Sequence, residues 1–345
     1  MNIEIIFEPD MPPDQLAELA IVAENYGIRA LWASNFWASW DAFISLVQVA
    51  QATERIELGP LAISPFEMHP IKIANAIISL NEISKGRSMV AIGGGGGLLR
   101  VMGKVLDPKK MRIVRAVREA IEIVQGAASG EPHEPYHGEI YQFDRPHHYK
   151  WVQHKPARIY ACATEPQMCR MAGRVADSLQ LSDVALPMLD ETMENIRTGL
   201  ARRETPAQDF RVSNFWAWHI KADRETSYYE GRRELVFRGS LLPPYSLHHF
   251  LEPAEEKLVI DNWQSFATAF WTRSGVVENV PERIVNHLVD ELTCVGDLSD
   301  IDKEIERLKK FEAGGITDMA IRLFDDPLEG LKMIGERVVP AFAGS

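Results

Sequence analysis

Residues 56–97 read IELGPLAISPFEMHPIKIANAIISLNEISKGRSMVAIGGGGG, a stretch in which the apolar pattern changes twice. Residues 56–63 form an apolar run that is typical of a buried strand in a parallel sheet. From Pro70 to the break at Lys85-Gly86 the apolar residues recur with a helical period, and residues 88–92 form a second short apolar strand. A strand, a helix and a strand in this order bring the carboxyl ends of both strands to one rim of a parallel sheet, where α/β folds bind ligands.

Five consecutive glycines, Gly93 to Gly97, follow the second strand. Glycine costs conformational entropy, so the run indicates a place where something approaches the backbone closely. Neither phosphate-binding fingerprint fits, because G-x-G-x-x-G lacks its last glycine and the span from Gly97 to Gly103 is one residue too long for a P-loop. A flexible loop is the alternative, but the position directly after a strand favours a functional role.

Strand and helix patterns alternate along the whole chain, which is the pattern of a parallel α/β fold. Counting gives eight strand candidates, and we predict a single (β/α)8 TIM-barrel domain over residues 1–345 with insertions near 126–156 and 239–279. The alternative is a doubly wound open sheet. The eight candidates are residues 2–7, 30–33, 56–63, 88–92, 158–163, 178–181, 211–220 and 316–324.

The composition excludes several classes of protein. The chain has 345 residues, of which 46% are hydrophobic, so it can bury a full core. Its formal net charge of -12 argues against nucleic acid and anionic membranes as partners. The amino terminus lacks the pattern of a signal peptide, no apolar run is long enough to span a bilayer, and three cysteines without disulfide or zinc spacing favour a reducing compartment. We therefore expect a cytoplasmic protein.

Several short motifs carry a resemblance to a known family: His69-Pro70 with Ala76 and Leu80, residues 82–87 and 91–95, residues 159–161 with 170–173, and Gly314 to Asp318. In this order they resemble the bacterial luciferase-like superfamily of flavin and deazaflavin oxidoreductases, and most of all its F420-dependent methylenetetrahydromethanopterin reductase branch. The match spans most of residues 1–340 and leaves 130–153 and 239–275 uncovered.

The resemblance implies a homodimeric (β/α)8 barrel that binds the ring of coenzyme F420, or alternatively FMN, at the carboxyl rim. It also implies a non-prolyl cis peptide bond at or near Leu61-Ala62. Backbone N–H groups after residue 163 could hold a phosphate of the cofactor tail, with Arg170 or Arg174 behind, although Glu165 weakens this site. The expected cofactor contacts are Asn35, Leu61, Ala62, Ile63, Gly94, Gly95, Gly96, Ala161, Cys162, Ala163 and Thr164.

The sequence departs from the family where acid–base chemistry is expected. Alcohol and sugar-phosphate dehydrogenases of the family end strand 2 in an Asp-His pair, but here Asn35 and Phe36 stand in those places, while Trp40 matches a family tryptophan. Phenylalanine cannot accept a proton, so oxidation of an alcohol by that route is not expected. The strand 1 glutamate of the methanopterin reductases aligns with Ile6, and Glu8 on the same strand face could replace it.

Glu8 is the first candidate proton donor, because a carboxyl group beside an apolar ring can retain a proton; a solvated turn acid is the alternative. His69 is the second candidate, and a structural residue at a helix start is its alternative. Four tryptophans could wall a pocket for a flat or apolar substrate, although core packing is the alternative for at least one of the last two. They are Trp37, Trp40, Trp216 and Trp218.

No metal site is expected. His133 and His137 have the spacing of metal ligands on a helix, but Pro135 between them argues against a helix there. We therefore predict an F420-dependent oxidoreductase that transfers a hydride to or from a small organic substrate, and a reductase rather than an alcohol dehydrogenase. The alternatives are an FMN-dependent monooxygenase and a cofactor-binding barrel without catalytic activity.

Overall fold

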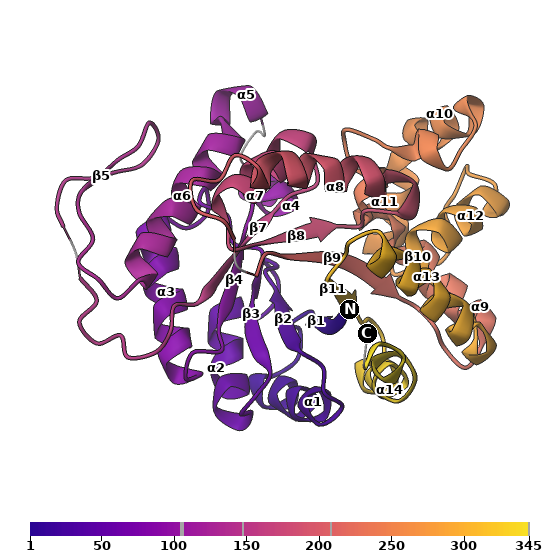
Figure 1. Ribbon diagram of the computed structural model, residues 1–345. Helices are drawn as coiled ribbons and strands as arrows, with labels where there is room; N and C mark the ends of the chain where they lie inside the picture. Colours follow the sequence, from indigo (N-terminus) through magenta and orange to yellow (C-terminus); the bar gives the residue numbers. More distant parts are fainter. Residues whose placement is uncertain (104–106, 147, 208, 344–345) are drawn as a thin grey trace.

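A barrel of eight parallel strands forms the centre of the molecule in the computed structural model, which describes residues 1–103, 107–146, 148–207 and 209–343 (Figure 1). The strands follow the order β3-β2-β1-β11-β9-β8-β7-β4. Parallel bridges from Leu58 to Ser88 and from Ile63 to Ile92 join β3 to β4, so the ring nearly closes. The predicted barrel is confirmed. Its strands are β1 Asn2–Phe7, β2 Ala30–Ser34, β3 Glu57–Leu61, β4 Met89–Ile92, β7 Arg158–Cys162, β8 Ser178–Ser182, β9 Arg211–Trp218 and β11 Asp318–Arg322.

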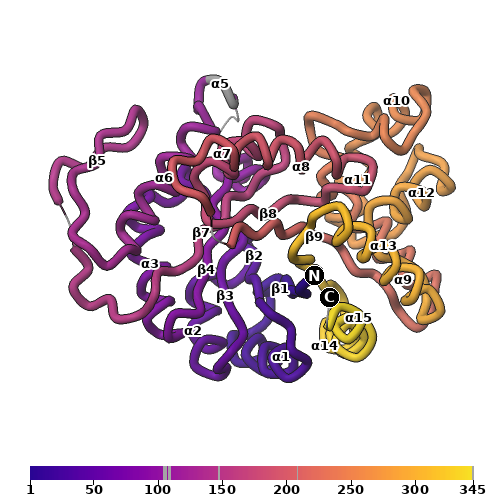
Figure 2. The backbone as a smooth tube through the Cα atoms, viewed as in Figure 1, coloured from indigo at the N-terminus to yellow at the C-terminus, as the bar shows by residue number. Residues whose placement is uncertain are grey.

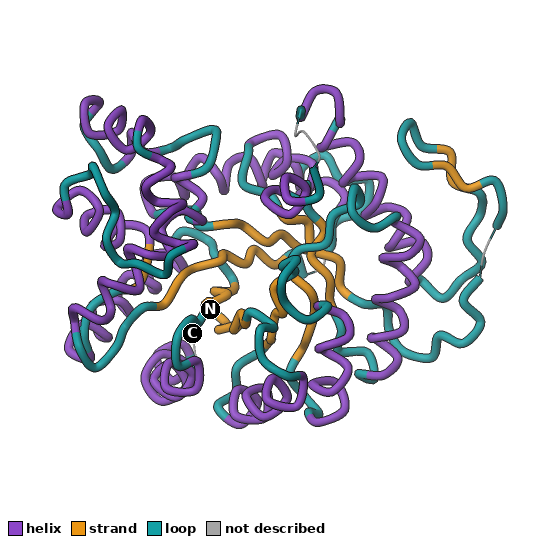
Figure 3. The backbone as a smooth tube through the Cα atoms, turned by 180° about the vertical axis from the view of Figure 1, so that it is seen from behind, coloured by secondary structure: helices purple, strands orange, loops and turns teal. Residues whose placement is uncertain are grey.

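Helices surround the strands, as the view from behind shows (Figure 3). Their starts follow local chemistry: Asp41 caps α2 by accepting from the backbone N–H groups of Phe43 and Ile44, and prolines occupy the first turn of α1, α3, α7 and α8. The two chain ends lie close together (Figure 2). The helices are α1 Pro13–Asn25, α2 Ala42–Ala52, α3 Pro70–Ile83, α6 Ile113–Ala128, α7 Pro166–Val175, α8 Leu186–Leu200, α9 Arg224–Glu234, α12 Glu282–Leu292, α13 Ile301–Ala313, α14 Pro327–Met333 and α15 Val339–Phe342.

Both predicted insertions differ from the strand–helix alternation. The first contains a short antiparallel hairpin of β5 (Tyr136–His137) and β6 (Gln142–Phe143), which projects away from the barrel in Figure 1; residue 147 within it lies outside the described residues. The second is largely helical, on the side of α9 and α12. It contains the short 3-10 turns η2 Gly239–Leu241 and η3 Leu247–His249 and the helices α10 Pro253–Asp261 and α11 Trp263–Trp271.

Two local features interrupt the regular alternation. The segment before β5 does not form one continuous helix but is broken into α5 (Pro108–Met111) and α6, because Arg112 adopts a left-handed conformation with φ of 50°. The glycine run is not a loop throughout, since Gly96 and Gly97 begin the short helix α4 (Gly96–Val101). Leu99 in α4 is fully buried, and this apolar contact explains why the chain turns into a helix.

The interior of the barrel is apolar at its centre and polar at the amino ends of the strands. Ile6, Trp32, Met89 and Tyr160 belong to the cluster inside the barrel, while a second and larger cluster lies between strands and helices. At the amino ends of the strands the interior is filled by an ionic network around Arg29. The opposite rim, at the carboxyl ends of the strands, is where (β/α)8 barrels place their active sites, and the candidate site lies there.

Candidate functional site

The candidate site lies where β2 and β3 end side by side. The Leu61–Ala62 peptide bond is cis, as the resemblance implied. The backbone N–H of Asn35 donates to the carbonyl oxygen of Leu61 at 2.9 Å, and the side-chain Nδ2 of Asn35 donates to the carbonyl oxygen of Ala62 at 3.1 Å. Asn35 thus holds the backbone at the end of β3.

The ends of β4 and β7 complete the rim, and glycine is required there by packing. A Cβ on Gly93 would lie 2.9 Å from the Cβ of Cys162 and 3.8 Å from that of Ala62. A Cβ on Gly94 would lie 2.9 Å from Cγ2 of Ile113, the first residue of α6. The close approach that the glycine run indicated is therefore, at these two positions, an approach of the protein to itself.

Most of the expected cofactor contacts come together at this rim, but three have little to offer a ligand. Ile63 and Ala161 are 3% and 0% exposed and pack in the cluster that faces the helices, because strand side chains alternate between the two faces. Gly96 lies in the first turn of α4 rather than in a loop. The side chains of Ile63 and Ala161 therefore face the helices, and any contact of these two residues with a cofactor would be through the backbone.

Cys162 and Thr164 lie where β7 ends. Cys162 packs against the cluster inside the barrel, and burial raises the pKa of its thiol to about 12, so the group stays protonated and is no nucleophile. Oγ1 of Thr164 accepts from the backbone N–H of Ser182 at 3.4 Å, which ties this loop to the end of β8.

Glu67 is a rim residue that the sequence analysis missed. Its Oε1 accepts from Nδ2 of Asn35 at 2.7 Å and from the backbone N–H of Ser64 at 2.8 Å. Its Oε2 is buried, and the described residues provide no hydrogen-bond partner for it. Burial raises the pKa of this carboxyl group, while the two donors act in the opposite direction. Nδ2 of Asn35, which donates to both Glu67 and the carbonyl oxygen of Ala62, therefore links Glu67 to the end of β3.

Glu8, the expected proton donor, is engaged on both oxygens. Oε1 accepts from Oγ of Ser39 at 2.6 Å, and Oε2 forms a salt bridge with Nη2 of Arg322 at 2.9 Å. The hydroxyl of Ser39 and the guanidinium of Arg322 thus hold the Glu8 side chain in place. Glu8 does lie at the mouth of the barrel, as its place after Ile6 on β1 predicted, and its catalytic role stays a prediction.

His69 lies on the same side of the barrel, but its side chain caps the start of α3. It is the N-cap of α3, and its Nδ1 accepts from the backbone N–H of Ile71 at 3.4 Å. Its ring contacts Tyr141 and Phe143 of the β5–β6 segment edge to face, and burial lowers its pKa. These contacts favour the structural alternative over a role as an acid.

Trp37 and Trp40 in the loop after β2 are 40% and 49% exposed, so both could contact a substrate. The Trp37 ring lies 5.9 Å from that of Trp271, at the end of α11 in the second insertion. Trp271 is 60% exposed, and the sequence analysis did not assign it to the pocket.

Trp216 and Trp218 do not line a pocket, and that prediction was wrong. They are 0% and 1% exposed and belong to the core between β9 and the helices, where Trp216 packs 5.2 Å from Phe311 of α13. Phe215 and Ser213 of β9 lie on the face toward the barrel interior, where Ser213 donates to Glu4. Alternation along β9 put both tryptophans on one face, and the outer face is the one that they occupy.

A buried ion pair closes the far side of the rim. Nη1 of Arg238 donates to Oδ1 of Asp183 at 2.6 Å, and the guanidinium lies 4.8 Å from the ring of Phe215. Both partners are at most 2% exposed, and burial raises the pKa of Asp183 against the opposing effect of Arg238. Because Arg238 directly precedes η2, the pair anchors the start of the second insertion to the barrel mouth.

Within the described ranges, the structure brings no three His, Cys, Asp or Glu side chains together in a way that could hold a metal ion. None of the described helices has the length and apolar character needed to cross a membrane.

Comparisons with known proteins agree with this architecture. The family model for luciferase-like monooxygenases matches residues 5–318. The chain is 25% identical over 346 residues to a 5,10-methylenetetrahydromethanopterin reductase of Archaeoglobus fulgidus, with 99% of each protein covered. It is 27% identical over 254 residues to an F420-dependent glucose-6-phosphate dehydrogenase of Kineococcus radiotolerans, covering 63% of this chain and 73% of that protein.

Among solved structures, the coenzyme F420 dependent tetrahydromethanopterin reductase of Methanopyrus kandleri has the same fold, with a TM-score of 0.80, 20% identity and 99% of both chains covered. The family model itself spans all but the start of β1 and the end of the chain. The chain belongs to the luciferase-like monooxygenase family.

Proposed function

We propose that the protein is a coenzyme F420-dependent oxidoreductase that reduces a small organic substrate by hydride transfer. Two relatives support the cofactor: one is named for F420, and the other is a reductase that matches the chain over its full length. Small residues, Ala62, Gly93 and Cys162, stand at the ends of the three neighbouring strands β3, β4 and β7, where the ring would lie at the barrel mouth. When bound, the deazaflavin would supply the hydride.

The environment of Glu67 is the observation that supports reduction, rather than oxidation, of the substrate. A reduction that ends in a protonated product needs a group that holds a proton near neutral pH and can release it. Burial favours the protonated form of Glu67, and its Oε2 has no partner within the described residues. Asn35 holds Oε1 and orients the carboxyl group. The place of the Asp-His pair is taken by Asn35 and Phe36, so no base stands there for the oxidation of an alcohol.

The first test separates the cofactors. The protein without cofactor is titrated with F420 and with FMN, and we expect binding of F420. Tight binding of FMN alone would favour an FMN-dependent monooxygenase, and binding of neither would remove the proposal. A panel of enones and imines is then offered with reduced F420, and the absorbance of the deazaflavin reports turnover. Binding without turnover of any substrate would favour a barrel that only binds the cofactor.

The second test assigns the proton donor. Glu67→Gln keeps an oxygen that accepts from Asn35 and Ser64 but cannot release an acidic proton. We expect its turnover number to fall about 100-fold or more while F420 affinity is retained. Glu8→Gln is the matched comparison, since Glu8 lies at the same rim in a salt bridge with Arg322. A larger loss in Glu8→Gln than in Glu67→Gln would return the donor role to Glu8.

We further propose that the chain is one barrel domain interrupted near 126–156 and 239–279, and that it works as a homodimer in the cytoplasm. Its family resemblance and its mild acidic charge support these points. Light scattering after size-exclusion chromatography measures the assembled mass, and a monomer at micromolar concentration would contradict the dimer.

A further inference from the structure

Glu67 lies in the loop between β3 and α3, and hydrogen bonds around Ser64 shape this loop. The backbone N–H groups of Glu67 and Met68 donate to the carbonyl oxygen of Ser64 at 3.1 and 3.0 Å, and that of Phe66 donates to Oγ of Ser64 at 3.2 Å. The N–H of Ser64 in turn donates to Oε1 of Glu67 at 2.8 Å. The backbone of residues 64–69, which we call the Glu67 loop, therefore sets the place of the carboxyl group.

Tyr141, between β5 and β6 of the first insertion, contacts the Glu67 loop. Its Oη donates to the carbonyl oxygen of Pro65 at 2.9 Å, across 76 positions of the chain. Its ring packs edge to face on that of His69, with 5.5 Å between the ring centres. Burial raises the pKa of the hydroxyl to about 12, so the group stays protonated and remains a donor near neutral pH. Tyr141 thus touches the loop at both of its ends.

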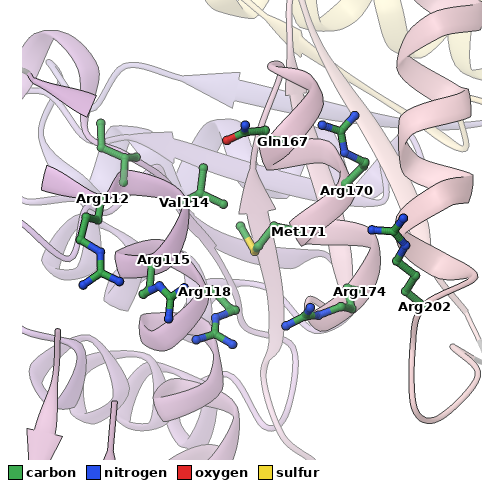
Figure 4. Close-up of a pocket in the computed structure, with 10 residues that line it drawn as sticks. Arg112, Val114, Arg115, Arg118, Gln167, Arg170, Met171, Arg174 and Arg202 are labelled. Atoms are coloured by element: carbon green, nitrogen blue, oxygen red, sulfur yellow. The ribbon is translucent and has the colours of Figure 1, made fainter. Parts of the chain in front are cut away.

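The backbone around Tyr141 is itself fixed to α6. Glu119 of this helix is fully buried and accepts from the backbone N–H groups of residues 139–141 at 2.9, 2.9 and 3.0 Å. Arg112 and Arg115, at the start of α6, both contact Glu139, and Figure 4 shows these two arginines beside a cavity of about 650 Å³. The helix layer therefore holds a side chain that reaches a loop of the barrel rim.

Anchoring of the hairpin does not require the bond to Pro65. Besides the contacts of Glu119, Oη of Tyr136 in β5 donates to Oε2 of Glu122 in α6 at 2.6 Å. These bonds hold the hairpin on the helix whether or not Tyr141 reaches the loop. The hydrogen bond from Tyr141 to Pro65 is an addition to that anchor, and it acts on the Glu67 loop.

We propose that Tyr141 is a positioning residue, which fixes the Glu67 loop so that the carboxyl group meets Asn35 at the end of β3. This inference rests on the proposed function, in which Glu67 is the proton donor. Proton transfer requires the two heavy atoms to approach within about 2.6–3.2 Å, and small displacements reduce the rate steeply. Loss of one neutral hydrogen bond that supports the donor is therefore expected to lower turnover about fivefold.

Tyr141→Phe tests this assignment, because it removes Oη and keeps the ring that packs on His69. We expect its turnover number to fall about fivefold, while the KM for substrate and the Kd for F420 stay as in the wild type. Tyr136→Phe is the matched control, since it removes a phenolic hydroxyl from the same hairpin without a change at the Glu67 loop. Its turnover number should be that of the wild type, and thermal melting checks that both variants fold.

A double variant distinguishes positioning from a general loss of structure. If Tyr141 acts through Glu67, Tyr141→Phe lowers turnover in the wild type but not in Glu67→Gln, whose residual turnover no longer depends on that proton. Single turnovers of reduced F420 with an enone measure both rates. Equal factors in the two backgrounds would show that Tyr141 does not act through Glu67, and the assignment would be wrong.

Hydrogen exchange examines the loop without cofactor or turnover. We expect the backbone N–H groups of residues 64–69 to exchange faster in Tyr141→Phe than in the wild type, and at the wild-type rate in Tyr136→Phe. Unchanged exchange of these groups in Tyr141→Phe would overturn the inference.

The outcomes separate this inference from the proposed function. If Glu67→Gln loses turnover and Tyr141→Phe does not, the role of Tyr141 is wrong while the proposed function stands. If Glu67→Gln keeps full turnover, Glu67 is not the donor and the inference fails with it. If F420 does not bind the wild-type protein, the proposed function fails, and hydrogen exchange still decides whether Tyr141 holds the loop.

Discussion

Glu67 is the residue whose carboxyl group most directly links the stability of the folded protein to pH. Because burial raises its pKa above the ordinary value of 4.5, the folded protein holds this proton more tightly than the unfolded chain does. Its contribution to stability is therefore full below about pH 4.5 and is lost as the pH rises through the folded pKa.

Glu67→Gln removes this titration. We expect the urea midpoint of Glu67→Gln, measured against that of the wild type, to rise between pH 4.5 and pH 7.5, because only the wild type loses stability over that range. The glutamine still offers an oxygen to Asn35 and to the N–H of Ser64, so the hydrogen bonds remain. A difference between the two proteins that is constant with pH would contradict the raised pKa.

Buried and exposed tryptophans among the four candidates should respond differently to mutation. Trp216→Ala removes a fully buried ring from the core beside α13, and we expect a loss of about 3–5 kcal/mol in the free energy of unfolding with F420 affinity retained. Trp37→Ala removes an exposed ring, so stability should change little and the KM for substrate should rise. Denaturant unfolding and steady-state kinetics on both variants measure the contrast, and equal losses of stability would contradict it.

The two tryptophans of β9 and Glu67 show why the site was harder to predict than the core. In a barrel both faces of a strand are buried, so the pattern Trp216-Ala217-Trp218 shows that the tryptophans share a face but not which face it is. Glu67 stands alone in a loop, and a single loop carboxylate has no periodicity to identify it. Its role became visible only when Asn35, from the end of another strand, was placed against it.

At the scale of elements, the turn from β4 into α4 allows a matched pair of glycine substitutions. Gly95 has φ of 93°, and a Cβ there would lie 2.7 Å from Cγ of Leu99 and from Oγ of Ser64. Gly97 lies in α4, and no atom of the described residues lies within 4 Å of an added Cβ there. We expect Gly95→Ala to lower the free energy of unfolding by about 1–3 kcal/mol and Gly97→Ala to raise it by about 0.4–1 kcal/mol.

Thermal and denaturant unfolding of both variants decide the point. The opposite signs matter more than the sizes, because a general intolerance of side chains in the glycine run would destabilise both proteins. Stabilisation by Gly95→Ala would show that the backbone at this position can leave the left-handed region without cost.

All eight barrel strands were found from sequence because parallel strands buried on both faces appear as short apolar runs between helical segments. The elements that were missed or misplaced depend on single backbone conformations. Arg112, with φ of 50°, separates α5 from α6, and arginine gives no warning of this as glycine would. Gly95 makes the turn into α4, whose start is hidden inside a run of identical residues.

At the scale of the whole molecule, the two ends of the barrel carry different chemistry. The carboxyl rim holds, at Glu67, a carboxyl oxygen for which the described part of the chain offers no hydrogen-bond partner, while the amino end pairs its buried carboxylates with Arg29. Arg29 contacts Glu4 of β1, lies 2.9 Å from Asp318 of β11 and 2.5 Å from Glu57 of β3, and so ties together three strands. Buried ion pairs thus hold the amino end of the barrel together.

Removing Arg29 tests whether its ion pairs stabilise the amino end of the barrel. Arg29→Ala leaves Glu4 and Asp318, both 0% exposed, without their cation, and breaking a buried pair in this way costs about 3–5 kcal/mol. Burial already raises the pKa of Glu4 against the opposing effect of Arg29, so without Arg29 the carboxylate should be still less stable in its charged form. The cost should therefore be larger at pH 7.5 than at pH 5, where protonation of Glu4 relieves it.

Arg55→Ala, at an exposed position, should cost at most about 1 kcal/mol at either pH. Urea unfolding of both variants at the two pH values measures this, and a cost for Arg29→Ala that is equal at both would show that the network is held by packing rather than by charge.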